Sequence, residues 1–116
     1  VLNYMSMMKK SQRLTVAQFD AYFKSGKRYH GTYIQLVYSP ADTFHGAVVV
    51  GKKVYKTAVA RNRLRRQLYA VLFTASKQVG QVGVFQVLVK PAAKNVNVTE
   101  VKTELCDLLA QTTASR

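Results

Sequence analysis

The sequence predicts an α/β fold: a two-layer sandwich in which helices pack on a small mixed sheet of about four strands, in the order α-β-β-(β)-α-β-α. Runs of β-branched and aromatic residues, which are typical of strands, separate stretches whose apolar residues recur at helical spacing. Residues that cap helices stand just before two of these helical stretches. Since 48% of the 116 residues are hydrophobic, the chain can bury a core as one compact domain.

The first helix is expected over residues 16–24. Thr15 and Gln18 have the spacing of a capping box, and Phe19 and Phe23 lie four residues apart on one helix face. This spacing alone leaves open whether the two rings are buried or exposed. A basic loop is expected to follow at residues 27–31.

Residues 1–13 show no clear periodicity and carry three basic residues. We interpret them as a partly ordered basic arm. A single folded domain is then expected over residues 14–116.

Strands are expected at residues 33–38 and 44–50, where β-branched and aromatic residues are frequent. A short apolar run at residues 84–89 reads as a third, buried strand that ends before Pro91. A long helical pattern lies between the last two strands, at residues 57–78.

The last helix is expected to begin after Asn97, which forms a second capping-box pattern with Glu100. Its spacing places Glu100, Glu104 and Asp107 on a face exposed to solvent. Cys106 falls beside the inner face and is expected to be a small core residue.

Positive charge dominates the middle of the chain. Between Asp42 and Glu100 there are ten Lys or Arg residues and no Asp or Glu, and the whole chain has a formal net charge of +13. Because nothing in this segment neutralises the charge, we expect a polyanionic partner, and nucleic acid is the favoured class. The basic and amide residues that gather before and at the start of the long helix are Lys52, Lys53, Lys56, Arg61, Asn62, Arg63, Arg65 and Arg66.

On a helical projection, Arg61, Asn62, Arg65 and Arg66 share an arc with Tyr69, which is expected to offer a stacking surface, and Arg63 falls on the far flank. Arginine suits a phosphate partner because its planar guanidinium can hold two oxygens at once. The alternative is a helix face that only meets solvent. It is disfavoured because like charges four residues apart, as at Arg61 and Arg65, destabilise a helix that has no ligand.

Composition also argues against several other classes of protein. The single cysteine excludes an internal disulfide and a zinc site built on cysteines, and it fits a reducing compartment. No apolar run approaches the roughly 20 residues of a membrane span, so no membrane partner is expected and the cytoplasm is the expected location. His30 and His45 stand in or beside loops, where a catalytic pair and surface histidines near RNA both fit.

The five carboxylates of the chain are too few and too scattered for the two-metal site of an autonomous nuclease. No catalytic residue, metal site or cofactor is therefore assigned to the protein alone.

Residues 51–66 resemble the arginine signature of the protein subunit of bacterial ribonuclease P. The resemblance is carried by Gly51-Lys52-Lys53 and, after a short spacer, by Ala58-Val59-Ala60-Arg61-Asn62-Arg63-Leu64-Arg65-Arg66. Upstream, Arg13-Leu14, Phe19, Phe23 and Gly26-Lys27-Arg28 stand in the family's order. The match covers roughly residues 13–89, and the order of expected elements agrees with the family's α/β fold.

This resemblance implies that the chain assists a catalytic RNA in removing the 5′ leader of precursor tRNA and does not cut RNA by itself. The implied partners are the catalytic RNA and precursor tRNA, and Mg²⁺ would act in the ribonucleoprotein, held mainly by RNA. The residues implied to contact the catalytic RNA are Lys52, Lys53, Lys56, Arg61, Asn62, Arg63, Arg65 and Arg66. Those implied to contact the leader are Phe19, Phe23, Tyr33, Tyr38, Lys27 and Arg28, although a solvated turn explains Lys27 and Arg28 equally well.

The chain departs from the family's pattern at two places. Tyr69 and Ala70 stand where the family commonly has Arg and Glu, so an RNA contact or a local ion pair is missing there. Gln86 stands about where an Asp is frequent in the late strand. The competing function is that of a structural RNA-binding protein of ribosomal type, because composition alone does not separate the two.

Overall fold

The computed structural model describes residues 14–78 and 82–114. The expected basic arm at residues 1–13 lies outside the described residues. The first described helix, α2 (Val16–Ser25), begins at the predicted capping box. The backbone N–H of Gln18 donates to Thr15 Oγ1 over 3.2 Å, and the backbone N–H of Thr15 donates to Gln18 Oε1 over 2.9 Å.

Four strands form one mixed sheet, as predicted. They are β1 (Lys27–His30), β2 (Ile34–Ser39), β3 (Phe44–Val49) and β4 (Gly83–Val89), and they lie side by side in the order β1-β2-β4-β3. The β1–β2 and β2–β4 pairs are antiparallel, whereas β3 runs parallel to β4. The late strand β4 is therefore an inner strand of the sheet.

The prediction of a basic loop at residues 27–31 is wrong, because residues 27–30 form the edge strand β1. Its polar sequence gives no strand signal of its own. Backbone pairing with β2 determines its conformation instead, with Arg28 opposite Val37 and Tyr29 opposite Leu36.

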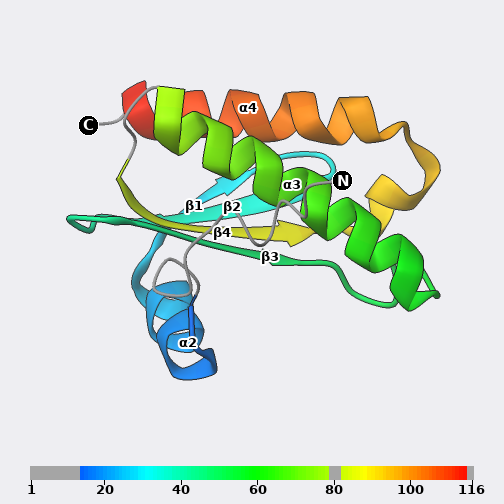
Figure 1. The fold of residues 1–116 in the computed structure, drawn as a ribbon, viewed down its shortest axis with the longest axis horizontal. Helices are drawn as coiled ribbons and strands as arrows, with labels where there is room; N and C mark the ends of the chain where they lie inside the picture. Colours follow the sequence, from blue (N-terminus) through cyan, green and yellow to red (C-terminus); the bar gives the residue numbers. More distant parts are fainter. Residues whose placement is uncertain (1–13, 79–81, 115–116) are drawn as a thin grey trace.

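Two long helices, α3 (Ala58–Gln78) and α4 (Val98–Ala114), cover one face of the sheet (Figure 1). A 3-10 turn, η2 (Pro91–Asn95), leads from β4 into α4. Asn97 Oδ1 accepts a hydrogen bond from the backbone N–H of Thr99 over 2.9 Å, as expected for a capping residue. The core between these two helices and the sheet contains buried side chains from both: Ile34, Leu36, Leu64, Leu68, Leu72, Phe85, Val87, Val101, Leu105 and Leu108.

The helix α2 lies on the opposite face of the sheet (Figure 1). Alternation along β4 points Phe85 and Val87 toward α3 and α4, and it points Gln86 toward α2. Gln86 Nε2 donates to the backbone oxygen of Phe19 over 2.8 Å. No side chain of α2 is itself fully buried, whereas Val37, Val84 and Gln86 on this face of the sheet are.

None of the helices within residues 14–78 and 82–114 combines the length and apolar character needed to cross a bilayer.

Candidate nucleic-acid interface

The loop between β3 and α3 carries three of the predicted contact residues on an ordered backbone. The backbone N–H of Val54 donates to the oxygen of Gly51 over 3.1 Å, and the Val54 side chain is buried in the core. Lys52 and Lys53, within this turn, are exposed, and so is Lys56 just after it. A buried valine thus anchors a loop whose three lysines all face solvent.

The helix α3 presents one continuous exposed face at its N-terminal end. Leu64, Leu68 and Leu72 point into the core. The residues that lie on the opposite side, all exposed, are Val59, Asn62, Arg63 and Arg66. Their spacing of three, four and seven residues from Val59 places them on one ridge, which we call the α3 ridge.

Arg61 lies off this ridge and is half-buried. Its Nη1 donates to the backbone oxygens of Tyr55 and Lys56 over 3.0 and 2.8 Å. The guanidinium therefore ties the first turn of α3 to the loop before it.

Arg65 is also half-buried and has a partner on the ridge. Its Nη1 donates to Asn62 Oδ1 over 2.6 Å. The predicted arc placed Asn62 with Arg66, and both are exposed on the ridge. It is wrong in excluding Arg63, which shares the ridge, and in including Arg61 and Arg65, which flank it.

Tyr69 is not a stacking surface for RNA, contrary to expectation. It is only 8% exposed and belongs to the core. Its hydroxyl oxygen accepts a hydrogen bond from the backbone N–H of Val48 over 3.3 Å. Since β3 is an edge strand, this contact satisfies a backbone donor that would otherwise lack a partner.

On the other face of the sheet, α2 presents a pair of half-buried aromatic rings. Phe19 and Phe23 stack with ring centroids 5.9 Å apart and an interplanar angle of 11°. The Arg28 guanidinium lies 4.2 Å from the Phe23 ring centroid, and its Nη2 donates to the backbone oxygen of Phe23 over 2.8 Å. Phe19, Phe23 and Arg28 thus form one cluster, which we call the α2 aromatic cluster.

The other residues predicted to bind the leader lie elsewhere. Tyr38 packs against the core residue Phe85 with ring centroids 5.1 Å apart, on the face covered by α3 and α4. Tyr33 packs at the edge of the same core, beside α4. Lys27 lies 5.3 Å from the ring centroid of Tyr29, another core residue. The structure therefore does not bring Tyr33, Tyr38 or Lys27 together with the α2 aromatic cluster.

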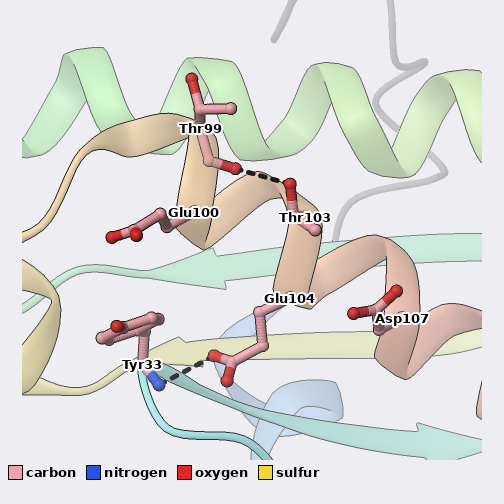
Figure 2. A pocket seen from close by; sticks show the side chains of 6 residues that line it. All are labelled: Tyr33, Thr99, Glu100, Thr103, Glu104 and Asp107. Carbon is pink, nitrogen blue, oxygen red and sulfur yellow. Dashed lines mark hydrogen bonds between the residues drawn. The ribbon is translucent and has the colours of Figure 1, made fainter.

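A shallow hollow of about 300 Å³ lies between α4 and the β1–β2 turn (Figure 2). Its lining residues are Tyr33, Thr99, Glu100, Thr103, Glu104 and Asp107. Glu100 and Asp107 are exposed as predicted, but Glu104 is not on a purely solvated face.

The Glu104 carboxylate holds the turn between β1 and β2. It accepts hydrogen bonds from the backbone N–H groups of Thr32, of Tyr33 over 2.8 Å and of Ile34 over 2.9 Å. From the end of β4, Lys90 Nζ donates to the backbone oxygen of Gly31 over 2.7 Å. The sequence does not reveal the contact between Glu104 and this turn, because its partners are about 70 residues apart and no local pattern marks them.

The remaining candidates do not gather into a site. His30 is exposed at the end of β1, and His45 Nε2 lies 2.9 Å from Thr43 Oγ1. Cys106 is exposed, so its predicted place in the core is wrong. Within the described residues, no three His, Cys, Asp or Glu side chains are grouped so that they could hold a metal ion.

Comparisons with known proteins identify the family. Residues 8–113 match the family described as Ribonuclease P. The ribonuclease P protein component of Lactobacillus helveticus is 34% identical over 107 residues, covering 89% of this chain and 88% of that protein. That of Microcystis aeruginosa is 32% identical over 100 residues, covering 80% and 82%.

Solved structures share the fold. The Staphylococcus aureus RNase P protein superposes with a TM-score of 0.78 at 21% identity, covering 89% of this chain and 96% of that one. A mutant of that protein with defective mRNA degradation activity superposes with a TM-score of 0.80 at 23% identity, covering 97% and 98%. The chain therefore belongs to the ribonuclease P family, as a protein component of this ribonuclease.

Proposed function

We propose that this chain binds the catalytic RNA of ribonuclease P through the start of α3 and thereby assists removal of the 5′ leader from precursor tRNA. The observation that carries the proposal is the concentration of positive charge around the α3 ridge. The exposed Lys52, Lys53, Lys56, Arg63 and Arg66 stand in a segment without a single carboxylate. An RNA backbone is the partner that offsets such charge.

The N-terminal end of α3 strengthens this attraction. Backbone N–H groups at a helix start carry partial positive charge and favour anions. No acidic residue stands in the first turn of α3. The field there is therefore positive from both the side chains and the backbone.

The α2 aromatic cluster is the surface that we propose for the single-stranded leader. Stacking on an aromatic ring stabilises an unpaired base by about 1 to 3 kcal/mol and does not select a sequence. Phe19 and Phe23 are half-buried rather than enclosed in the core, which leaves part of each ring accessible. Arg28 adds a positive charge beside them for the leader phosphates.

Mg²⁺ in the ribonucleoprotein is proposed to be held mainly by RNA. The Glu104 oxygens already accept three backbone hydrogen bonds, and the described residues contain no group of three His, Cys, Asp or Glu side chains that could hold an ion. RNA phosphates supply the oxygen ligands that Mg²⁺ prefers.

The test is cleavage of a 5′-extended precursor tRNA at low Mg²⁺ by a bacterial ribonuclease P RNA, with this protein present and absent. A third reaction contains the protein alone with the precursor tRNA and with an unstructured RNA. Leader removal that requires both components supports the proposal. No stimulation by the protein would favour a structural RNA-binding role, and cleavage of the precursor by the protein alone would contradict the assignment of catalysis to RNA.

A further inference from the structure

We infer that the arginine signature is divided in two: Arg61 and Arg65 position other groups, whereas Asn62, Arg63 and Arg66 contact the RNA backbone. This inference rests on the proposed function, because it names which side chains of that surface meet the ligand. It arises from the difference in burial and bonding among these neighbouring residues.

Arg61 donates hydrogen bonds to two backbone oxygens. Nη1 carries two hydrogens, and both are accounted for by the oxygens of Tyr55 and Lys56. A phosphate that took this edge of the guanidinium would have to break both hydrogen bonds. Arg61 therefore fixes the loop that carries the three exposed lysines, and so reduces the entropy that RNA binding would otherwise cost.

Arg65 fixes the orientation of the Asn62 side-chain amide. A guanidinium can only donate hydrogen bonds, so the Asn62 atom 2.6 Å from Arg65 Nη1 must be the carbonyl oxygen. The two N–H donors of the Asn62 amide are then left for another partner. Because Asn62 is exposed on the α3 ridge, its amide presents donors, and not an acceptor, to a ligand rich in acceptor oxygens.

Arg63 and Arg66 complete this surface. Both are exposed, and neither side chain has a hydrogen-bond or ionic partner in the described part of the chain. With Asn62 they form a row of donors at spacings of one, three and four residues along one helix face. A run of RNA phosphates is the ligand that matches such a row. Contacts to phosphates do not depend on the base sequence of the RNA.

The experiment measures the affinity of the full chain for a short RNA duplex and for a bacterial ribonuclease P RNA over a range of KCl concentrations. Arg61→Ala and Arg63→Ala are a matched pair, since each removes one guanidinium from the same helix end. Arg63→Ala and Arg66→Ala should each reduce the slope of log affinity against log salt by about 0.7 to 0.9. Arg61→Ala and Arg65→Ala should weaken binding while reducing the slope by less than half of that amount. Equal slope losses for Arg61 and Arg63 would overturn the division.

Two further readouts separate positioning from contact. Arg61→Ala should accelerate amide hydrogen exchange at Val54 and Tyr55 in the free protein, whereas Arg63→Ala should not. Asn62→Ala should weaken binding about fivefold with an unchanged slope, because a neutral donor displaces no counterion. In the Asn62→Ala background, Arg65→Ala should cost little further affinity, and additive losses would show that Arg65 does not act through Asn62.

Measuring both RNAs separates a failure of the proposed division from a failure of the proposed function. Binding of both RNAs by the unaltered chain with undivided arginine effects contradicts only the division. A chain that binds neither RNA contradicts the proposed function as well. Circular dichroism and thermal unfolding of each variant ensure that the compared proteins are folded.

Discussion

At the scale of single residues, the charged side chains of this protein fall into two groups with different roles. Some, such as Lys53 and Arg63, face solvent without a partner in the described part of the chain. Others, such as Glu104 and Arg61, bind backbone groups of a neighbouring segment. The first group gives the surface its charge. The second fixes neighbouring loops, and Arg61 fixes the loop that carries the exposed lysines.

Glu104→Gln should destabilise the protein by about 1 to 3 kcal/mol, because an amide offers one acceptor oxygen and turns its NH₂ group toward backbone donors. The affected donors are those of Thr32, Tyr33 and Ile34. Urea unfolding gives the change in the free energy of unfolding. Glu100→Gln, four residues earlier on the same helix and exposed, is the control and should change stability by less than about 0.5 kcal/mol. Equal effects at the two positions would show that the turn does not depend on Glu104.

Tyr69→Phe should also lower the free energy of unfolding, by about 1 kcal/mol, because the buried N–H of Val48 loses its acceptor. The ring remains in place, so packing of the core is retained. Guanidinium unfolding monitored by fluorescence gives the midpoint and the slope. A midpoint equal to that of the unaltered protein would mean that water replaces the Tyr69 hydroxyl as the hydrogen-bond acceptor for the Val48 N–H.

At the scale of elements, α2 differs from α3 and α4 in how it is attached. The two long helices bury leucine and valine side chains against the sheet. The shorter α2 buries no side chain fully and is tied by the Gln86–Phe19 hydrogen bond and the Arg28–Phe23 contacts. Polar ties of this kind allow a helix to move locally without unfolding the sheet.

Gln86→Leu should loosen α2 and leave the sheet stable. Gln86 is fully buried, and its Oε1 has no partner in the described part of the chain. Leucine removes this unsatisfied oxygen together with the bond to Phe19, so the two effects on global stability oppose each other. Hydrogen exchange should be faster in α2 and unchanged in β4. Gln35→Leu, which is on the same sheet face, is the control, and a loss of protection throughout the sheet would contradict local attachment.

Phe19→Ala should weaken binding of leader-bearing precursor tRNA more than binding of mature tRNA, because only the precursor has an unpaired 5′ leader whose bases can stack on the ring. Titration of labelled RNAs against the ribonucleoprotein gives both affinities. Val16→Ala, on the same helix and 80% exposed, should leave the ratio of the two affinities unchanged. If Phe19→Ala weakened both RNAs equally, the ring would have only a structural role.

At the scale of the whole molecule, the sequence was sufficient where the signal was local or strongly periodic. The capping box at Thr15, the helix that carries Arg61 to Arg66 and the buried strand around Phe85 were all predicted. The missed features depend on partners far along the chain. The edge strand at Tyr29 forms because β2 pairs with it, and Tyr69 is buried because α3 packs against β3. A helical projection gives angles around an axis, but it does not say which of the flanking arginines meets a carbonyl oxygen.

Because ligands that bind the native state stabilise it, polyanions should raise the melting temperature of the whole molecule. At a ligand concentration of about 100 times Kd, the gain is about 2.7 kcal/mol. Thermal unfolding with and without an RNA duplex measures the shift, and concentrated KCl should abolish it by screening. A shift that survives high salt would indicate contacts other than those made by the net charge of +13.

The position of β4 in the sheet has a consequence for how the chain folds. This strand lies between β2 and β3, yet it follows them by more than thirty residues of sequence. Each of these two pairings closes a long loop, which lowers the folding rate relative to structures built from local contacts. During synthesis, a chain that does not yet include Gly83 lacks β4, the strand that connects the β1–β2 pair with β3. Assembly of the sheet is therefore expected to be a late, cooperative event, completed only after α3 has been synthesised.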